Sequence, residues 1–235
     1  MNLFNFTLVA LSLCFSYAIG DDCRPESHGK SFLIGYGSLM NEQSLNTSIK
    51  DHGAFEPVEV KGFRRSFDFT YNLYGLKSAM LAVYQDESSS MNAVIIELDE
   101  KDIAVLDKRE SGYCRKQVAS NAVKLYSDAI SLQTDTSIWI YVAKEAAVDV
   151  DDSYLIPQSY IDLFLGGCIA LEKEFSVPDF AKSCVLTTHQ WDQRYVVNDR
   201  IYPRRPWSYQ PMAMKVDKLL EENAPNVIEN RRFES

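Results

Sequence analysis

Two short segments hold the residues whose types and spacing could do chemistry. The first is Gly35-Tyr36-Gly37-Ser38-Leu39, which ends a short apolar run and places two glycines around an aromatic residue. Such glycines permit a sharp turn in which successive backbone N–H groups point the same way, and that geometry binds an anion or a developing oxyanion. On spacing alone, a plain turn at the end of a strand, with Tyr36 in the core, is the favoured interpretation.

The second segment is Leu106–Tyr113, in which Glu110 stands where a predicted helix ends and a strand begins. A carboxylate at such a junction could face a cleft between the two elements. If apolar groups surrounded it, its pKa would rise, as a general base near neutral pH requires. Read without other knowledge, the residue is more simply a surface glutamate paired with Lys108 or Arg109.

Several other kinds of site are disfavoured by what the sequence lacks. The three histidines have no paired metal spacing and there is no Cys-x-x-Cys, so a zinc site is not indicated. Gly35-Tyr36-Gly37 lacks the third glycine and the lysine of nucleotide-binding loops, and Ser38 is not in a Gly-x-Ser-x-Gly context. A Cys/His nucleophile pair, Cys184 or Cys114 with His189, stays as a minor alternative that nothing local supports.

The elements that must position these residues follow from periodicity and turn signals. Strands are predicted at 31–36, 57–69, 78–84, 91–98, 113–119, 121–126 and 137–143, with a turn at 86–90. Helices are predicted at 41–51, 99–109, 157–175, 178–188 and 215–223, and irregular coil at 201–211. Strands first and helices later predict an α+β fold: a mixed sheet or barrel with helices packed around it.

The N-terminus predicts export. Residues 1–20 contain no charged side chain, and their apolar run ends in Ala18-Ile19-Gly20, which is typical of a signal peptide and too short for a good membrane span. Residues 21–30 are interpreted as a polar linker. Four cysteines remain in the mature chain, and the sequence leaves their three pairings open. A net charge of −9 makes nucleic acid and anionic membranes poor partners.

Tyr36-Gly37-Ser38-Leu39 followed by Glu110, with Lys61–Arg65 on an early strand and Tyr141 in a late one, resembles the γ-glutamylcyclotransferase-like (AIG2-like) family. The resemblance implies a small mixed β-barrel with flanking helices over residues 31–150. Residues 151–235 would then be a C-terminal helical extension packed on that domain.

The resemblance also implies a reaction, in which the α-amine of a γ-glutamyl group attacks its own γ-carbonyl and releases 5-oxoproline. Glu110 would be the catalytic acid/base. The N–H groups of Gly37, Ser38 and Leu39 would hold substrate oxygens, while Tyr141 and Tyr36 position the substrate. No metal or organic cofactor is needed. The substrate is a small γ-glutamyl compound, and the leaving group stays open because Leu39 and Asn41 depart from the patterns of two family branches.

Two further possibilities come with this interpretation. A non-catalytic barrel that binds a small anion or peptide is the alternative function. An arginine could receive a substrate carboxylate through two parallel hydrogen bonds, although surface pairing that contributes little is the commoner role. The candidates are Arg64, Arg65, Arg204 and Arg205.

Overall fold

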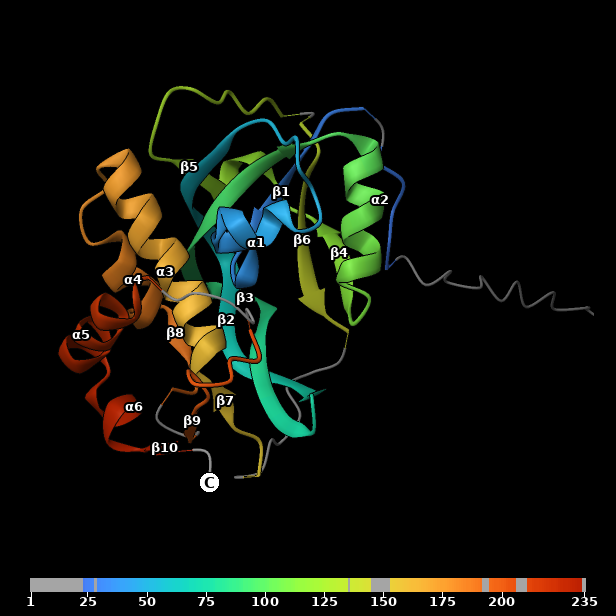
Figure 1. Cartoon of the computed structure of the whole chain (residues 1–235). Coiled ribbons are helices and arrows are strands. Elements are labelled where there is room, and N and C mark those ends of the chain that lie inside the picture. Colours follow the sequence, from blue (N-terminus) through green and yellow to red (C-terminus); the bar gives the residue numbers. More distant parts are fainter. Residues whose placement is uncertain are drawn as a thin grey trace, which may run out of the picture.

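The computed structural model describes residues 23–27, 29–134, 136–144, 153–191, 195–205 and 211–233. A seven-stranded mixed sheet has the order β4-β6-β1-β3-β2-β5, with β8 beside β2 (Figure 1). Its strands are β1 (Ser31–Gly35), β2 (Phe55–Leu73), β3 (Leu76–Leu98), β4 (Tyr113–Gln117), β5 (Val123–Leu125), β6 (Ile138–Ala143) and β8 (Thr188–His189). Because β1 pairs parallel with β6 and antiparallel with β3, the predicted mixed sheet of an α+β fold is confirmed.

The long β2–β3 hairpin is the largest unit of the sheet. Tyr74 and Gly75 form its two-residue turn, and both have positive φ, 49° and 84°, as tight hairpin turns require. The pairing register shifts between Lys61 and Phe63 and again between Ser66 and Phe69. Such bulges bend a strand and increase its twist, which lets one hairpin curve around the core.

The turn predicted at 86–90 is wrong, because these residues remain within β3. Lys61 pairs with Ser90 and Phe63 with Gln85, so the extra residues of β3 stand opposite Gly62 as a bulge. Asp86 accepts hydrogen bonds from the hydroxyls of Ser88 and Ser89 inside that bulge. The turn-forming residues therefore bond to one another within the bulge, while the pairing of β2 with β3 continues on both sides of it.

The helices agree with most of the predicted ones. They are η1 (Ser38–Met40), α1 (Glu42–Asn46), α2 (Glu100–Arg109), η2 (Ser120–Ala122), α3 (Gln158–Phe175), α4 (Phe180–Leu186), α5 (Ala213–Asn223) and α6 (Pro225–Glu229). Asp99 and Asp102 form a capping box at the start of α2, which satisfies N–H groups that lack an intrahelical partner. Helix α1 is shorter than the predicted 41–51, and part of the predicted coil at 201–211 lies outside the described residues.

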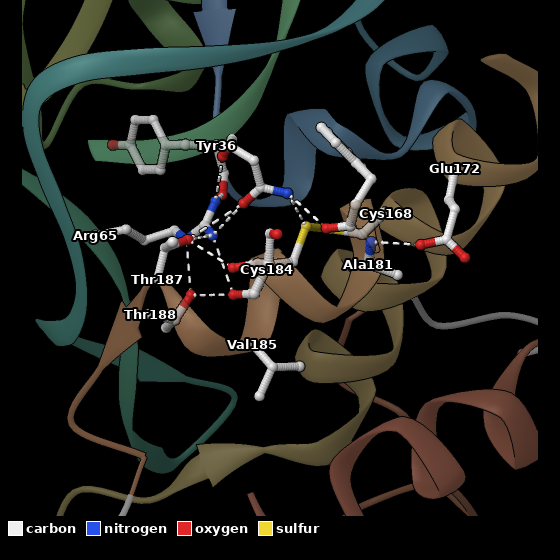
Figure 2. Close-up of a disulfide and its surroundings, with 12 residues drawn as sticks. Tyr36, Arg65, Cys168, Glu172, Ala181, Cys184, Val185, Thr187 and Thr188 are labelled. Atoms are coloured by element: carbon white, nitrogen blue, oxygen red, sulfur yellow. Dashed lines mark hydrogen bonds between the residues drawn. A yellow bond between two sulfur atoms is a disulfide. The ribbon is translucent and has the colours of Figure 1, made fainter. Parts of the chain in front are cut away.

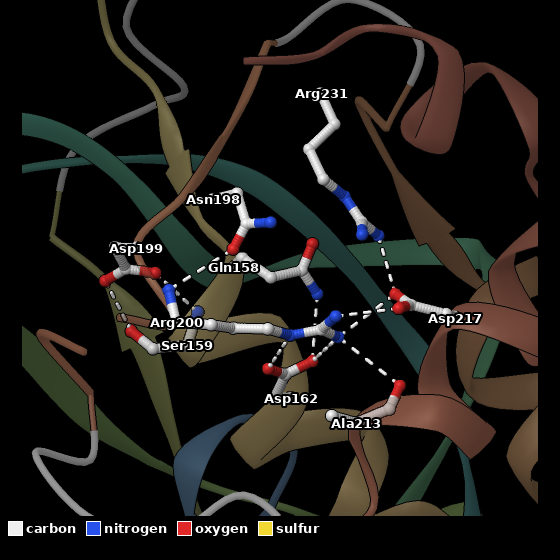
Figure 3. A network of polar contacts seen from close by, with 9 residues as sticks. All are labelled: Gln158, Ser159, Asp162, Asn198, Asp199, Arg200, Ala213, Asp217 and Arg231. Atoms are coloured by element: carbon white, nitrogen blue, oxygen red, sulfur yellow. Dashed lines mark hydrogen bonds and ion pairs between the residues drawn. The ribbon is translucent and has the colours of Figure 1, made fainter. Parts of the chain in front are cut away.

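The C-terminal region packs on the domain through α3 and a partly buried polar network. Arg200 bridges the carboxylates of Asp162 on α3 and Asp217 on α5, at 2.7 Å to each, and Arg231 also binds Asp217 (Figure 3). A small parallel sheet, β7 (Ile156–Pro157), β9 (Val196–Asn198) and β10 (Arg231–Phe233), lies in the same region. These contacts hold α3 against the sheet.

Two disulfides join separate elements of the chain. Cys168–Cys184 links α3 to α4, and Cys23–Cys114 ties the N-terminal segment to β4. The segment interpreted as a linker is therefore attached to the domain from Cys23, which is itself buried. The predicted signal peptide, residues 1–20, lies outside the described residues. Within the part of the chain that is described, no helix has the length and apolar character to cross a membrane.

Candidate active site

All six residues that the sequence assigned to the site line one small cavity of about 40 Å³. The loop after β1 contributes Tyr36 to Leu39, the end of α2 contributes Glu110, and β6 contributes Tyr141. Three lining residues were not predicted: Leu81, Tyr113 and Tyr160. Tyr113 is three residues after Glu110, a spacing that could have suggested it. Tyr160 lies on α3, and no local pattern marks it.

Glu110 ends helix α2 and points into the cavity. Its N–H still bonds the carbonyl of Leu106, and its own carbonyl accepts from the N–H of Tyr113. The side chain is only 17% exposed, and the Nε of Arg109 lies 3.2 Å from its Oε1. Burial raises the pKa of Glu110, and the nearby positive charges of Arg109, Arg205 and Arg24 oppose that rise. The alternative of a surface glutamate is wrong, although its pairing with Arg109 is confirmed.

Four tyrosines line the cavity with this carboxylate: Tyr36, Tyr141 and Tyr160 are buried, and Tyr113 is partly buried. Burial raises the pKa of Tyr36, Tyr113 and Tyr141, and it raises that of Tyr160 to about 12. All four therefore keep their protons at neutral pH. Tyr113 donates its hydroxyl to the carbonyl of Leu81 at 3.0 Å. The cavity is thus lined by neutral hydroxyls around one titratable group.

The loop after β1 folds into the short helix η1. The carbonyls of Gly37 and Ser38 accept from Met40 and Asn41, while the first N–H groups of any helix lack an intrahelical acceptor. A Cβ at Gly37 would lie 2.8 Å from the Tyr160 hydroxyl, so glycine lets α3 approach the loop closely. The segment Gly35–Leu39 is therefore more than the plain turn favoured on spacing alone, because it also packs against Tyr160.

Comparison with known proteins shows the family to which the chain belongs. The family model described as "Gamma-glutamyl cyclotransferase, AIG2-like" matches residues 33–160, more than half of the chain. The chain belongs to the γ-glutamylcyclotransferase, AIG2-like family. A search of curated proteins gave no match.

The solved structures that match this chain have low sequence identity to it. One titled "Gamma-glutamyl cyclotransferase" is 15% identical over 66% of this chain and 86% of its own, with a TM-score of 0.47. An uncharacterized protein from Homo sapiens is 15% identical over 67% and 87%, also at 0.47. A yeast cyclotransferase whose title states that it is specific to glutathione is 12% identical over 69% and 98%, at 0.41.

An arginine that precedes the family match contacts the site. Arg24 donates from Nη2 to the carbonyls of Glu110, at 2.9 Å, and Tyr113, at 3.1 Å. Its Nη1 lies 2.7 Å from Oδ1 of Asp107, and the same oxygen accepts the Tyr141 hydroxyl at 2.8 Å. The neighbouring Cys23–Cys114 disulfide holds Arg24 in this position. No local pattern in the sequence indicates this arrangement, because Arg24 falls in the predicted linker.

Of the four arginines considered for a substrate carboxylate, Arg65 is excluded. It is fully buried, and its guanidinium donates to Thr187, Thr188, the carbonyl of Tyr36 and other groups around α4 (Figure 2). Burial lowers its pKa to about 9. Arg65 therefore fastens the site loop to α4 and has no donor left for a ligand.

The other three arginines differ in their surroundings. Arg64 lies on the surface, 3.8 Å from Asp86, and Arg204 is 3.9 Å from the buried Asp199. Arg205 is close enough to Glu110 to oppose the rise of its pKa. Of the four, Arg205 is the one that stays a candidate for substrate contact.

The cysteine-nucleophile alternative is wrong. Cys114 and Cys184 are both disulfide-bonded, so neither offers a thiolate to pair with His189.

Proposed function

We propose that this chain is an enzyme that releases 5-oxoproline and a free amine from a small γ-glutamyl substrate. The observation that carries the proposal is the position of Glu110: a largely buried carboxylate in a cavity lined by the Gly37–Leu39 loop, Leu81 and four tyrosines. Membership of the γ-glutamylcyclotransferase, AIG2-like family supports it.

The reaction is an intramolecular acyl transfer. The α-amine nitrogen of the substrate attacks its own γ-carbonyl carbon, and the bond from that carbon to the leaving nitrogen breaks. Tethering the nucleophile in a five-membered ring already lowers the barrier. Glu110 takes the proton from the attacking amine and returns it to the leaving nitrogen, so the overall step neither gains nor loses a proton. The raised pKa of Glu110 suits both halves of that transfer.

The loop and the tyrosines would orient the substrate. The N–H groups at the start of η1 line the cavity and are suited to the oxyanion of the tetrahedral intermediate. The Tyr141 hydroxyl donates to Asp107, which leaves its oxygen lone pairs for a hydrogen bond from the substrate amine. Tyr36 would fix the other side of the glutamyl group.

We also propose that the mature chain acts in the secretory route or outside the cell. The apolar N-terminus supports this, and so do the two disulfides, which persist in oxidising compartments and are rare in the cytosol.

The test is 5-oxoproline release by the purified chain from Asp21 onward, offered glutathione, a γ-glutamyl amino acid and γ-glutamyl-lysine. We expect Glu110→Gln to lower kcat by about 10²–10⁴-fold, the usual contribution of a general acid/base. Glu221→Gln makes the same chemical change at an exposed position of α5 and serves as the matched control. A folded Glu110→Gln variant with full activity would refute the role of Glu110, and a folded wild type that turns over none of the substrates would refute the enzyme.

A further inference from the structure

A second and much larger hollow lies beside the active-site cavity. It is a groove of about 610 Å³ between α1, α3 and the segment that contains Met212. That volume is within the range of sites that hold small organic ligands. One wall is a stripe along α3, formed by Leu163, Gly166, Gly167, Ala170, Leu171 and Glu174. At 1.5 Å per residue the stripe is about 16 Å long.

The groove comes close to the carboxylate of Glu110. Arg109 lines the groove, and its Nε lies 3.2 Å from the Oε1 of Glu110, which lines the cavity. Tyr160, in the first turn of α3, lines the cavity as well, so the stripe runs from the cavity outward along the helix. A substrate whose glutamyl end reached Glu110 would extend its other end into this groove.

Arg205 stands at the inner end of the groove. Its backbone N–H is fixed by the hydroxyl of Ser159 at 2.8 Å. Among the described residues, its guanidinium makes no hydrogen bond or ion pair, whereas Arg109 binds Ser38, Ser44 and Ser48. Its charge opposes the raised pKa of Glu110, which agrees with a place near the carboxylate.

The acidic side chains of the groove do not compete for this arginine. Asp162 is bound by Arg200 at 2.7 Å, Glu42 lies 3.3 Å from His52, and Glu174 is at the far end of the α3 stripe. Within the described part of the chain, the inner end therefore offers a planar cation with no charge partner, which is suited to a carboxylate.

We propose that the groove is the leaving-group subsite of the enzyme, in which Arg205 receives the α-carboxylate of a departing α-amino acid and the apolar wall receives its side chain. This inference rests on the proposed function. About half of the residues that line the groove, including Arg205 and the stripe on α3, lie beyond the family match of 33–160.

The bond count selects this class of leaving group. In a γ-glutamyl α-amino acid the carboxylate is two bonds from the scissile nitrogen, so it falls beside Glu110, where Arg205 lies. In glutathione the carboxyl group of the cysteine forms the peptide bond to glycine, so the free carboxylate is that of glycine, five bonds from the scissile nitrogen. In a γ-glutamyl-ε-lysine isopeptide the carboxylate is still farther. The apolar wall, with Met40, Phe55 and Leu163, favours a large hydrocarbon side chain such as that of leucine.

Two substrates that differ by one carboxylate test the proposal: γ-glutamyl-leucine and γ-glutamyl-isoamylamine. We expect wild type to turn over the first with a kcat/KM about 10–100-fold higher, as expected for hydrogen bonds to a charged group. Arg205→Met should remove most of that preference by lowering kcat/KM for γ-glutamyl-leucine alone, and Arg205→Lys should restore part of it. Arg64→Met makes the same substitution at the surface, next to Asp86, and should keep the preference.

Equal losses on both substrates in Arg205→Met would overturn the proposal, since Arg205 would then act on the glutamyl part. An unchanged preference would overturn it too. Calorimetric binding to Glu110→Gln separates this inference from the proposed function. If γ-glutamyl-leucine binds at least 10-fold tighter than the amine analogue, and loses that advantage with Arg205→Met, the subsite stands even when wild type shows no turnover. Equal binding of both compounds refutes the subsite even when turnover occurs.

Discussion

Two adjacent glycines of α3 provide a matched test of how the helix packs on the site loop. A Cβ at Gly167 would lie 2.4 Å from the carbonyl oxygen of Met40 and 2.8 Å from the backbone nitrogen of Asn41. A Cβ at Gly166 would meet only the side chain of Met212, at 3.7 Å, an ordinary contact. Alanine should therefore fit at Gly166 and clash at Gly167.

The magnitudes follow from two opposing effects. Replacing glycine by alanine inside a helix stabilises it by about 1 kcal/mol, and this gain is common to both positions. At Gly167 the helix or the loop must also move by about 1 Å to reach van der Waals separation. Overpacking of this kind costs about 1–3 kcal/mol, and the upper end applies here because the contacted atoms are backbone.

We expect Gly166→Ala to raise the free energy of unfolding by up to about 1 kcal/mol, and Gly167→Ala to lower it by about 2 kcal/mol. For a chain of this size the gap of about 3 kcal/mol corresponds to about 6–12 °C in Tm. Urea denaturation of both variants beside wild type measures it. If Gly167→Ala proves as stable as Gly166→Ala, α3 does not contact the loop at Met40 as described.

Three further perturbations address the site and its supports. The proposed function takes ionised Glu110 as the base, and burial raises its pKa, so kcat/KM should fall as pH drops through that raised pKa. A profile that stays flat down to pH 4 would contradict the proposal. Arg24→Ala removes a positive charge that lowers the pKa of Glu110, so the acid limb should move to higher pH. The Cys23→Ser/Cys114→Ser variant removes the disulfide beside Arg24 and should move the acid limb of the pH profile in the same direction. If neither variant moves the acid limb, Arg24 does not act on the Glu110 carboxylate. Arg65→Lys should destabilise the fold, because an ammonium group cannot make all the hydrogen bonds of the buried guanidinium and leaves several acceptors unsatisfied, at about 1–3 kcal/mol each. We expect urea denaturation to show a loss of at least about 3 kcal/mol in the free energy of unfolding. A loss under about 1 kcal/mol would refute the structural role of this residue.

What the sequence determined by itself was local. Apolar alternation and helix capping predicted most strands and the helix that ends at Arg109, because these patterns depend on neighbours within a few residues. The order of the glycine loop and Glu110 indicated the family. The same local reasoning erred at 86–90, where the turn-forming residues make a bulge inside a continuous strand.

What only the tertiary structure decided was environment. The surroundings of Glu110 depend on Tyr160 and Arg24, which are far apart in the sequence and share no sequence pattern with it. The sequence could not distinguish Arg65 from Arg205: one is a fully buried support of the loop, and the other is unpaired beside the carboxylate among the described residues. Burial, charge partners and disulfide pairing arise from contacts between distant segments, and a local pattern does not encode those contacts.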